Sequence, residues 1–118
     1  MKAFVATSEL TPINRSEEHG GEGPIRFLRL LGSGEFESAL DFVDFTTVPP
    51  GSSIGRHVHE ATEEIYYVVS GSPLIAVEGE RRRLSAHDVA IVRNGQSHEL
   101  QNDTPSDVTI LVVQARIA

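Results

Sequence analysis

The chain has 118 residues, 39% hydrophobic and 23% charged, with 10 Gly, 6 Pro and no Cys. This length is typical of one domain, and the composition excludes disordered and collagen-like chains. The lack of cysteine excludes disulfide scaffolds, thiolate metal sites and iron–sulfur clusters. A net charge of −7 argues against a nucleic-acid or anionic-membrane partner, and no apolar run approaches the ~20 residues of a spanning helix. We therefore expect a soluble, cytoplasmic domain.

The first 24 residues are predicted to form an irregular N-terminal arm. Pro12, Asn14 and the glycine-rich stretch 19–24 interrupt the chain, and no helical or strand period continues through residues 8–24. A single domain is expected over residues 25–118.

From residue 25 onward, short apolar runs alternate with Gly-, Pro- and Asn-containing turns. This pattern predicts an all-β domain, a small antiparallel sandwich or barrel. The runs are Ile25–Leu31, Ala39–Val48, Ile65–Val69, Leu74–Val77, Val89–Val92 and Val108–Val113.

Two of these runs, 65–69 and 110–113, are apolar at both strand parities. A strand with apolar residues on both faces is covered on both sides. In a domain this small, the second cover is expected to come from another copy of the chain, so we predict a homodimer.

Three histidines suggest a metal site. His57 and His59 are two residues apart, so their imidazoles share one face of a strand. Glu64 follows shortly after, and His98 comes after a turn that could bring it opposite the first pair. Three imidazoles and one carboxylate suit a first-row divalent metal. The alternative is that each histidine is an ordinary core or surface residue, and spacing has to decide between the two.

The spacing closely resembles that of the cupin family. The first cupin motif, G-x5-H-x-H-x3,4-E-x6-G, is matched at every position by Gly51, His57, His59, Glu64 and Gly71. This resemblance implies an all-β cupin fold, a small antiparallel β-barrel or jelly roll.

The second cupin motif, G-x5-P-x-G-x2-H-x3-N, is matched in part. Gly95, His98 and Asn102 fit, whereas His87 replaces the first Gly and Arg93 replaces the Pro. We expect His87 to adopt a left-handed backbone in a turn far from His98, because His tolerates that region better than most residues.

The resemblance implies that His57, His59, Glu64 and His98 are the metal ligands. Glu63 competes with Glu64, but only Glu64 has the six-residue spacing to the following Gly. Gly51, Gly71 and Asn102 are interpreted as structural residues.

Other residues have weaker indications. Tyr66 shares a strand face with Glu64, which makes it either a hydrogen-bonding acid near the metal or a core tyrosine. Arg93 is either a solvated loop charge or an anchor for an anionic substrate. Arg29 and Gln114 are polar groups in apolar runs that could line a cavity, and the basic run 81–83 is interpreted as a solvated turn with local ion pairs.

The implied centre holds one divalent transition metal per chain, with two adjacent coordination positions left open. Fe(II) is favoured, and Mn, Ni, Co, Cu and Zn also suit the ligands. A small anionic or enolisable metabolite is the expected substrate, and the expected activity is that of a metal-dependent oxidoreductase with dioxygenase-like chemistry. Metal-assisted lyase or isomerase chemistry is one alternative, and a non-catalytic ligand-binding or sensor cupin is the other, because cupins do all of these.

Overall fold

The protein folds into two antiparallel β-sheets. The computed structural model describes residues 3–117, and no α-helix occurs in that range. The strands are β1 (Ile13–Ser16), β2 (Pro24–Leu31), β3 (Leu40–Val48), β4 (Ser53–Val58), β5 (Thr62–Ser70), β6 (Leu74–Val77), β7 (Glu80–Arg83), β8 (Val89–Val92), β9 (Ser97–Gln101) and β10 (Val108–Arg116). Three single-turn 3-10 segments accompany them: η1 (Thr7–Glu9), η2 (Glu18–Gly20) and η3 (Ser33–Glu35).

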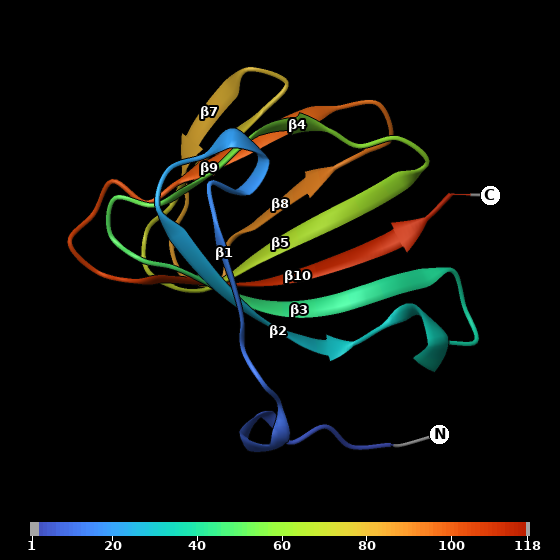
Figure 1. The fold of residues 1–118 in the computed structure, drawn as a ribbon. Helices are drawn as coiled ribbons and strands as arrows, with labels where there is room; N and C mark the ends of the chain where they lie inside the picture. The colour runs from blue at the N-terminus through green and yellow to red at the C-terminus, as the bar shows by residue number, and fades with distance from the viewer. Residues whose placement is uncertain (1–2, 118) are drawn as a thin grey trace.

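One sheet has six strands in the order β1-β2-β3-β10-β5-β8, and the other has four in the order β4-β9-β6-β7. Figure 1 shows the four-stranded sheet lying over one face of the six-stranded sheet. The predicted all-β barrel or jelly roll is thereby confirmed. The core between the sheets consists of Ile25, Val48, Ile54, Tyr66, Val68, Ile75, Leu100, Val108, Ile110 and Val112.

All six predicted apolar runs are strands, namely β2, β3, β5, β6, β8 and β10. The strands that hydrophobic pattern did not single out are β1, β4, β7 and β9. In β1 and β7 every residue is exposed, so neither strand has a buried face to produce alternation. Strands β4 and β9 carry the polar residues of the histidine cluster. Among the described residues, no helix is long and apolar enough to cross a membrane.

The segment predicted to be irregular contains an edge strand. Backbone pairing of β1 with β2 places Ile13 opposite Phe27. Further along the arm, η2 lies against β4, where Ser53 N donates to Glu22 O at 2.8 Å. After β1, the arm therefore passes along β4, the edge strand of the four-stranded sheet, before it returns to the six-stranded sheet as β2 (Figure 1).

The basic run 81–83, interpreted above as a solvated turn, is instead most of strand β7. The turn itself lies one step earlier, at Glu78 and Gly79, whose φ angles are +50° and +81°. The predicted exposure and a local ion pair are present, because Arg82 lies 3.8 Å from the carboxylate of Glu80. Arg83 instead forms an ion pair with the distant Asp103 at 2.6 Å.

The outer face of the six-stranded sheet is apolar. Cross-strand pairing forms two adjacent rows of five apolar residues on the face opposite the core. The first row is Leu28, Phe45, Leu111, Tyr67 and Val89, and the second is Leu31, Val43, Val113, Ile65 and Ile91. The four-stranded sheet covers the other face, so among residues 3–117 no strand packs on these rows. Ile65 and Val89 are accordingly 37% and 55% exposed.

Asn102 has the structural role predicted for it. Its side chain is 1% exposed, and its amide donates to the carbonyl oxygens of Val48 and Ser106, each at 2.8 Å. The backbone N–H of Gly51, whose φ is +80°, donates to Asn102 O at 2.9 Å. Asn102 thus joins the β3–β4 loop to the β9–β10 loop.

We predict that Asn102→Ala lowers the free energy of unfolding by about 2 kcal/mol, because the buried carbonyl of Val48 and the carbonyl of Ser106 lose their donor. Urea denaturation measures the change. Asn14→Ala, on the exposed strand β1, is the control and should stay within about 0.5 kcal/mol of wild type. Equal effects of the two substitutions would contradict the assigned role.

Candidate metal centre

Three histidines converge at β4, at the loop that follows β4, and at the neighbouring strand β9. His57 on β4 is directly opposite His98 on β9, and their ring centroids are 4.1 Å apart. His59 lies just beyond β4, with its ring 4.7 Å from that of His98. One ligand nitrogen from each ring lies within 4.8 Å of the other two. The predicted cluster therefore exists as a three-histidine group.

The local backbone orients two of these rings. His57 Nδ1 lies 2.9 Å from Gly55 O, and because a carbonyl only accepts, Nδ1 carries the proton. The lone pair of His57 is then on Nε2. His59 Nδ1 is hydrogen-bonded to Thr62 Oγ1 at 3.0 Å. A hydrogen bond at the outer nitrogen typically fixes the tautomer and orientation of a metal-binding histidine.

Glu64 on β5 supplies a carboxylate to the same place. It is 4% exposed, and its Oε1 lies 3.3 Å from His59 Nε2 and 3.5 Å from His98 Nε2. Glu63, the competing acid, has the opposite strand parity. The structure thus brings Glu64, rather than its neighbour, to the histidines.

This donor set fits a divalent transition metal. His59 Nε2 and His98 Nδ1 are buried and find no hydrogen-bond partner among residues 3–117. Burial, helped by the neighbouring imidazoles of His57, His59 and His19, lowers the pKa of His98 to about 3. His98 is therefore neutral at physiological pH, which is the form that binds metal, and three imidazoles with one carboxylate match first-row divalent ions.

Tyr66 lies in the same cluster. Its hydroxyl contacts His98 Nε2, and its ring packs edge-on against that imidazole at 5.0 Å between centroids. Burial, together with the carboxylate of Glu64, raises the pKa of Tyr66 well above 10. The phenol consequently keeps its proton and can donate a hydrogen bond within the site.

The cluster opens into a cavity of about 490 Å³ between the sheets. Arg29 and Gln114, the two strand residues suspected from sequence, both line it. Arg93, the proposed substrate anchor, is exposed and does not belong to the described cavity lining. A separate cavity of about 580 Å³ lies between β6, β7 and β8, away from the histidines.

An ion pair forms part of the cavity wall. Arg29 donates to Asp44 at 2.5 Å and 3.1 Å, and its guanidinium lies 4.5 Å from the centre of the Phe42 ring. Burial raises the pKa of Asp44, although Arg29 opposes the shift. The sequence analysis did not single out Asp44. The available signal was an acid at the inward parity of β3, which it shares with the buried residues Thr46 and Val48.

The other residue that no sequence motif connected with the site is His19. It belongs to η2 in the arm, lines the cavity, and stacks on His57 with 3.6 Å between ring centroids and 10° between planes. No local pattern connects residues 38 positions apart, so only the docking of the arm reveals this contact.

Comparison with known proteins identifies the class. A family model described as a cupin domain matches residues 44–114, so the chain belongs to the cupin family. An oxalate-binding protein of Thermotoga maritima is 33% identical over 109 residues, which cover 92% of this chain and 90% of the relative.

Two further relatives extend the comparison. The crystal structure of a predicted oxalate decarboxylase from Thermotoga maritima superposes with a TM-score of 0.93 at 32% identity, covering 97% of this chain and 99% of the other. The tetracenomycin polyketide synthase protein TcmJ of Streptomyces glaucescens is 28% identical over 100 residues, which are 85% of this chain and 62% of that protein.

The buried position of His98 predicts a pH-dependent stability for the metal-free protein. The unfolded chain binds a proton at this residue near pH 6.5, whereas the folded chain does so only near pH 3. The stabilising contribution is therefore complete above pH 6.5 and is lost as the pH falls toward 3, amounting to roughly 2 kcal/mol by pH 5. Urea denaturation at pH 7.5 and 5.0 measures the difference. In His98→Leu the difference should shrink by that amount, and an unchanged difference would contradict the assignment.

Proposed function

We propose that this cupin binds one divalent transition metal through His57, His59, Glu64 and His98, and that the metal binds a small chelating anion. The observation that supports this most directly is the convergence of three imidazoles and one buried carboxylate at a cavity. A metal held by these four residues would supply Lewis-acid chemistry to an oxygen-containing ligand.

Charge and relatives support the ligand class. A divalent ion with a single carboxylate ligand leaves a net positive centre, which favours an anion or enolate with two adjacent oxygens. Oxalate is such a ligand, and it is the one named for the relative that is 33% identical. The similarity to a polyketide synthase protein supports an enolisable ligand, because β-diketone oxygens chelate metals in the same way.

The chain's own groups hold and orient the ligand. The Tyr66 hydroxyl, which keeps its proton and contacts His98 Nε2, would provide a hydrogen-bond donor beside the bound ligand. The fixed guanidinium of Arg29 presents positive charge at the cavity wall. Gln114 on β10 also lines the cavity, and its amide donates a hydrogen bond of 2.8 Å to the carboxylate of Asp41. These contacts orient a small ligand and displace water from around it.

We further propose that the protein is an enzyme, with dioxygenase-like oxidation at Fe(II) as the first reaction to test and lyase or isomerase chemistry next. A binding function without turnover is the second candidate, supported by the oxalate-binding relative. Titration calorimetry with oxalate and a panel of diketones and phenolic acids, on protein loaded with Fe(II) or Mn(II), measures binding. Oxygen uptake and product analysis on the same samples separate the candidates: binding with no turnover of any ligand would contradict the enzymatic proposal.

His59→Ala should reduce metal affinity by more than about 100-fold, because loss of an outer hydrogen-bond partner alone costs 10–100-fold. Elemental analysis and chelator competition measure the loss, and circular dichroism checks that the barrel is intact. His87→Asn is the matched control, since His87 contacts Tyr67 on the other face of β5 and Asn tolerates its φ of +77°. Wild-type metal content in His59→Ala would overturn the proposed ligand set.

We propose that two copies of the chain cover each other's apolar outer rows, because large contiguous apolar patches on monomers are rare. Light scattering should then give twice the chain mass of 12.9 kDa. Leu111→Glu, in the middle of the first row, should shift the mass toward one chain, whereas Arg81→Glu on exposed β7 should not. A wild-type mass near 12.9 kDa would contradict the dimer.

A further inference from the structure

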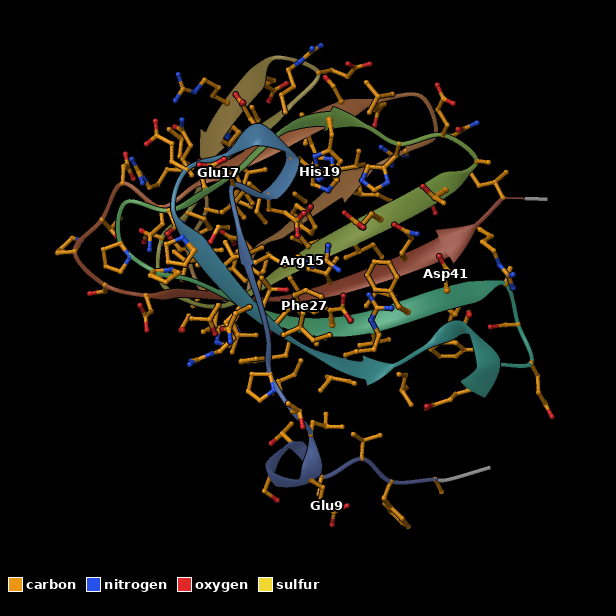
Figure 2. All side chains as sticks on the ribbon, in the orientation of Figure 1. Glu9, Arg15, Glu17, His19, Phe27 and Asp41 are labelled. Carbon is orange, nitrogen blue, oxygen red and sulfur yellow. The ribbon has the colours of Figure 1, made fainter. Side chains whose placement is uncertain are left out.

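The N-terminal arm places a fourth histidine beside the three-histidine cluster. The His19 imidazole lies parallel to that of His57, 3.6 Å away, while His57 is itself 4.1 Å from His98. Figure 2 shows His19 on the part of the arm that lies beside β4. Both His19 and Arg15, also labelled there, line the cavity between the sheets. One face of His57 is therefore covered by a ring from another part of the chain.

The backbone that presents His19 is strained. Glu17 and His19 have φ angles of +55° and +52°, and η2 has non-helical geometry at its centre. Residues with a Cβ uncommonly adopt this left-handed region, although His tolerates it better than most. Such strain persists where surrounding contacts enforce it, and it is concentrated at functional sites.

Close backbone packing enforces this conformation. A Cβ atom on Gly55 would lie 2.1 Å from His19 O, and one on Gly21 would lie 2.2 Å from Ser53 O. Two hydrogen bonds of 2.8 Å join Glu22 to Ser53 across the same contact. Only glycines at these two positions allow the arm to approach β4 so closely.

Gly55 links the two parts of this arrangement. Its missing side chain makes room for the His19 carbonyl, and its own carbonyl accepts the hydrogen bond from His57 Nδ1. The His57 ring is consequently held at one edge by Gly55 and across one face by His19. Rotation of the ring away from the centre would require the arm to move.

We infer that His19 is a positioning residue that holds His57 in its metal-binding orientation and makes the arm part of the metal site. This inference rests on the proposed metal centre. His19 acts by stacking rather than by ligation, since its ring is not one of the three whose nitrogens converge. The requirement at this position is therefore a flat ring, not a nitrogen donor.

Four variants test the inference with Co(II) as the probe. Affinity is measured by chelator competition, and ligand geometry by the visible absorption of the bound ion. His19→Ala should weaken Co(II) binding about 10–100-fold, the usual cost of losing a ligand-orienting partner, and should alter the absorption band. His19→Phe, which keeps a flat ring, should restore both the affinity and the band.

Glycine substitutions separate positioning from folding. His19→Gly and His87→Gly each remove a ring and relieve a left-handed backbone, since His87 has φ +77°. The metal-free His19→Gly protein should melt no lower than wild type and yet bind Co(II) as weakly as His19→Ala. His87→Gly, away from the site, should bind Co(II) like wild type.

The outcomes are distinct. Wild-type affinity and absorption in His19→Ala would overturn the inference and leave the metal centre intact. His19→Phe binding as weakly as His19→Ala, with an absorption band indicating one nitrogen fewer, would overturn it in favour of direct ligation. A wild-type protein that binds no Co(II) would overturn both the proposed function and the inference.

Discussion

The site depends on the close placement of three imidazoles and one carboxylate, with His98 and Glu64 almost fully buried. Buried polar atoms without partners are costly, and two imidazole nitrogens of this cluster have none among the described residues. The packed core between the sheets and the hydrogen bonds at the outer nitrogens hold the rings in this unfavourable arrangement. Burial keeps His98 neutral and Tyr66 protonated, because it lowers the pKa of the imidazole and raises the pKa of the phenol.

Much of the fold follows from hydrophobic pattern, and the exceptions have physical reasons. Every strand with a buried face and an apolar run was predictable. Strand β1 was not, because all four of its residues are exposed and only backbone pairing with β2 defines it. The run 81–83 looked like a turn because an exposed edge strand and a charged loop have the same composition. Edge strands depend on partners that sequence alone does not specify.

The site was predictable where it depends on strand periodicity and motif spacing. His57 and His98 face each other on the paired strands β4 and β9, His59 follows β4 directly, and Glu64 comes from β5 of the other sheet. His19 and Asp44 were not found, for different reasons. Asp44 carried a readable signal, an acid at an inward position of a buried strand, whereas the contact of His19 arises only when the arm folds back on β4. The structure adds no support for Arg93 as a substrate anchor, since its side chain is exposed and lies outside the cavity lining.

The proposed ligands come from both layers of the barrel: His57 and His98 belong to the four-stranded sheet, and Glu64 belongs to the six-stranded sheet. A bound ion would therefore act as a cross-link between the two sheets at the open end of the molecule. Separating the layers would then require release of the ion, so unfolding and metal loss become one coupled event. The rigidity of this end of the barrel would thus depend on whether the metal is bound. In the metal-free protein, the two sheets would separate first at this end.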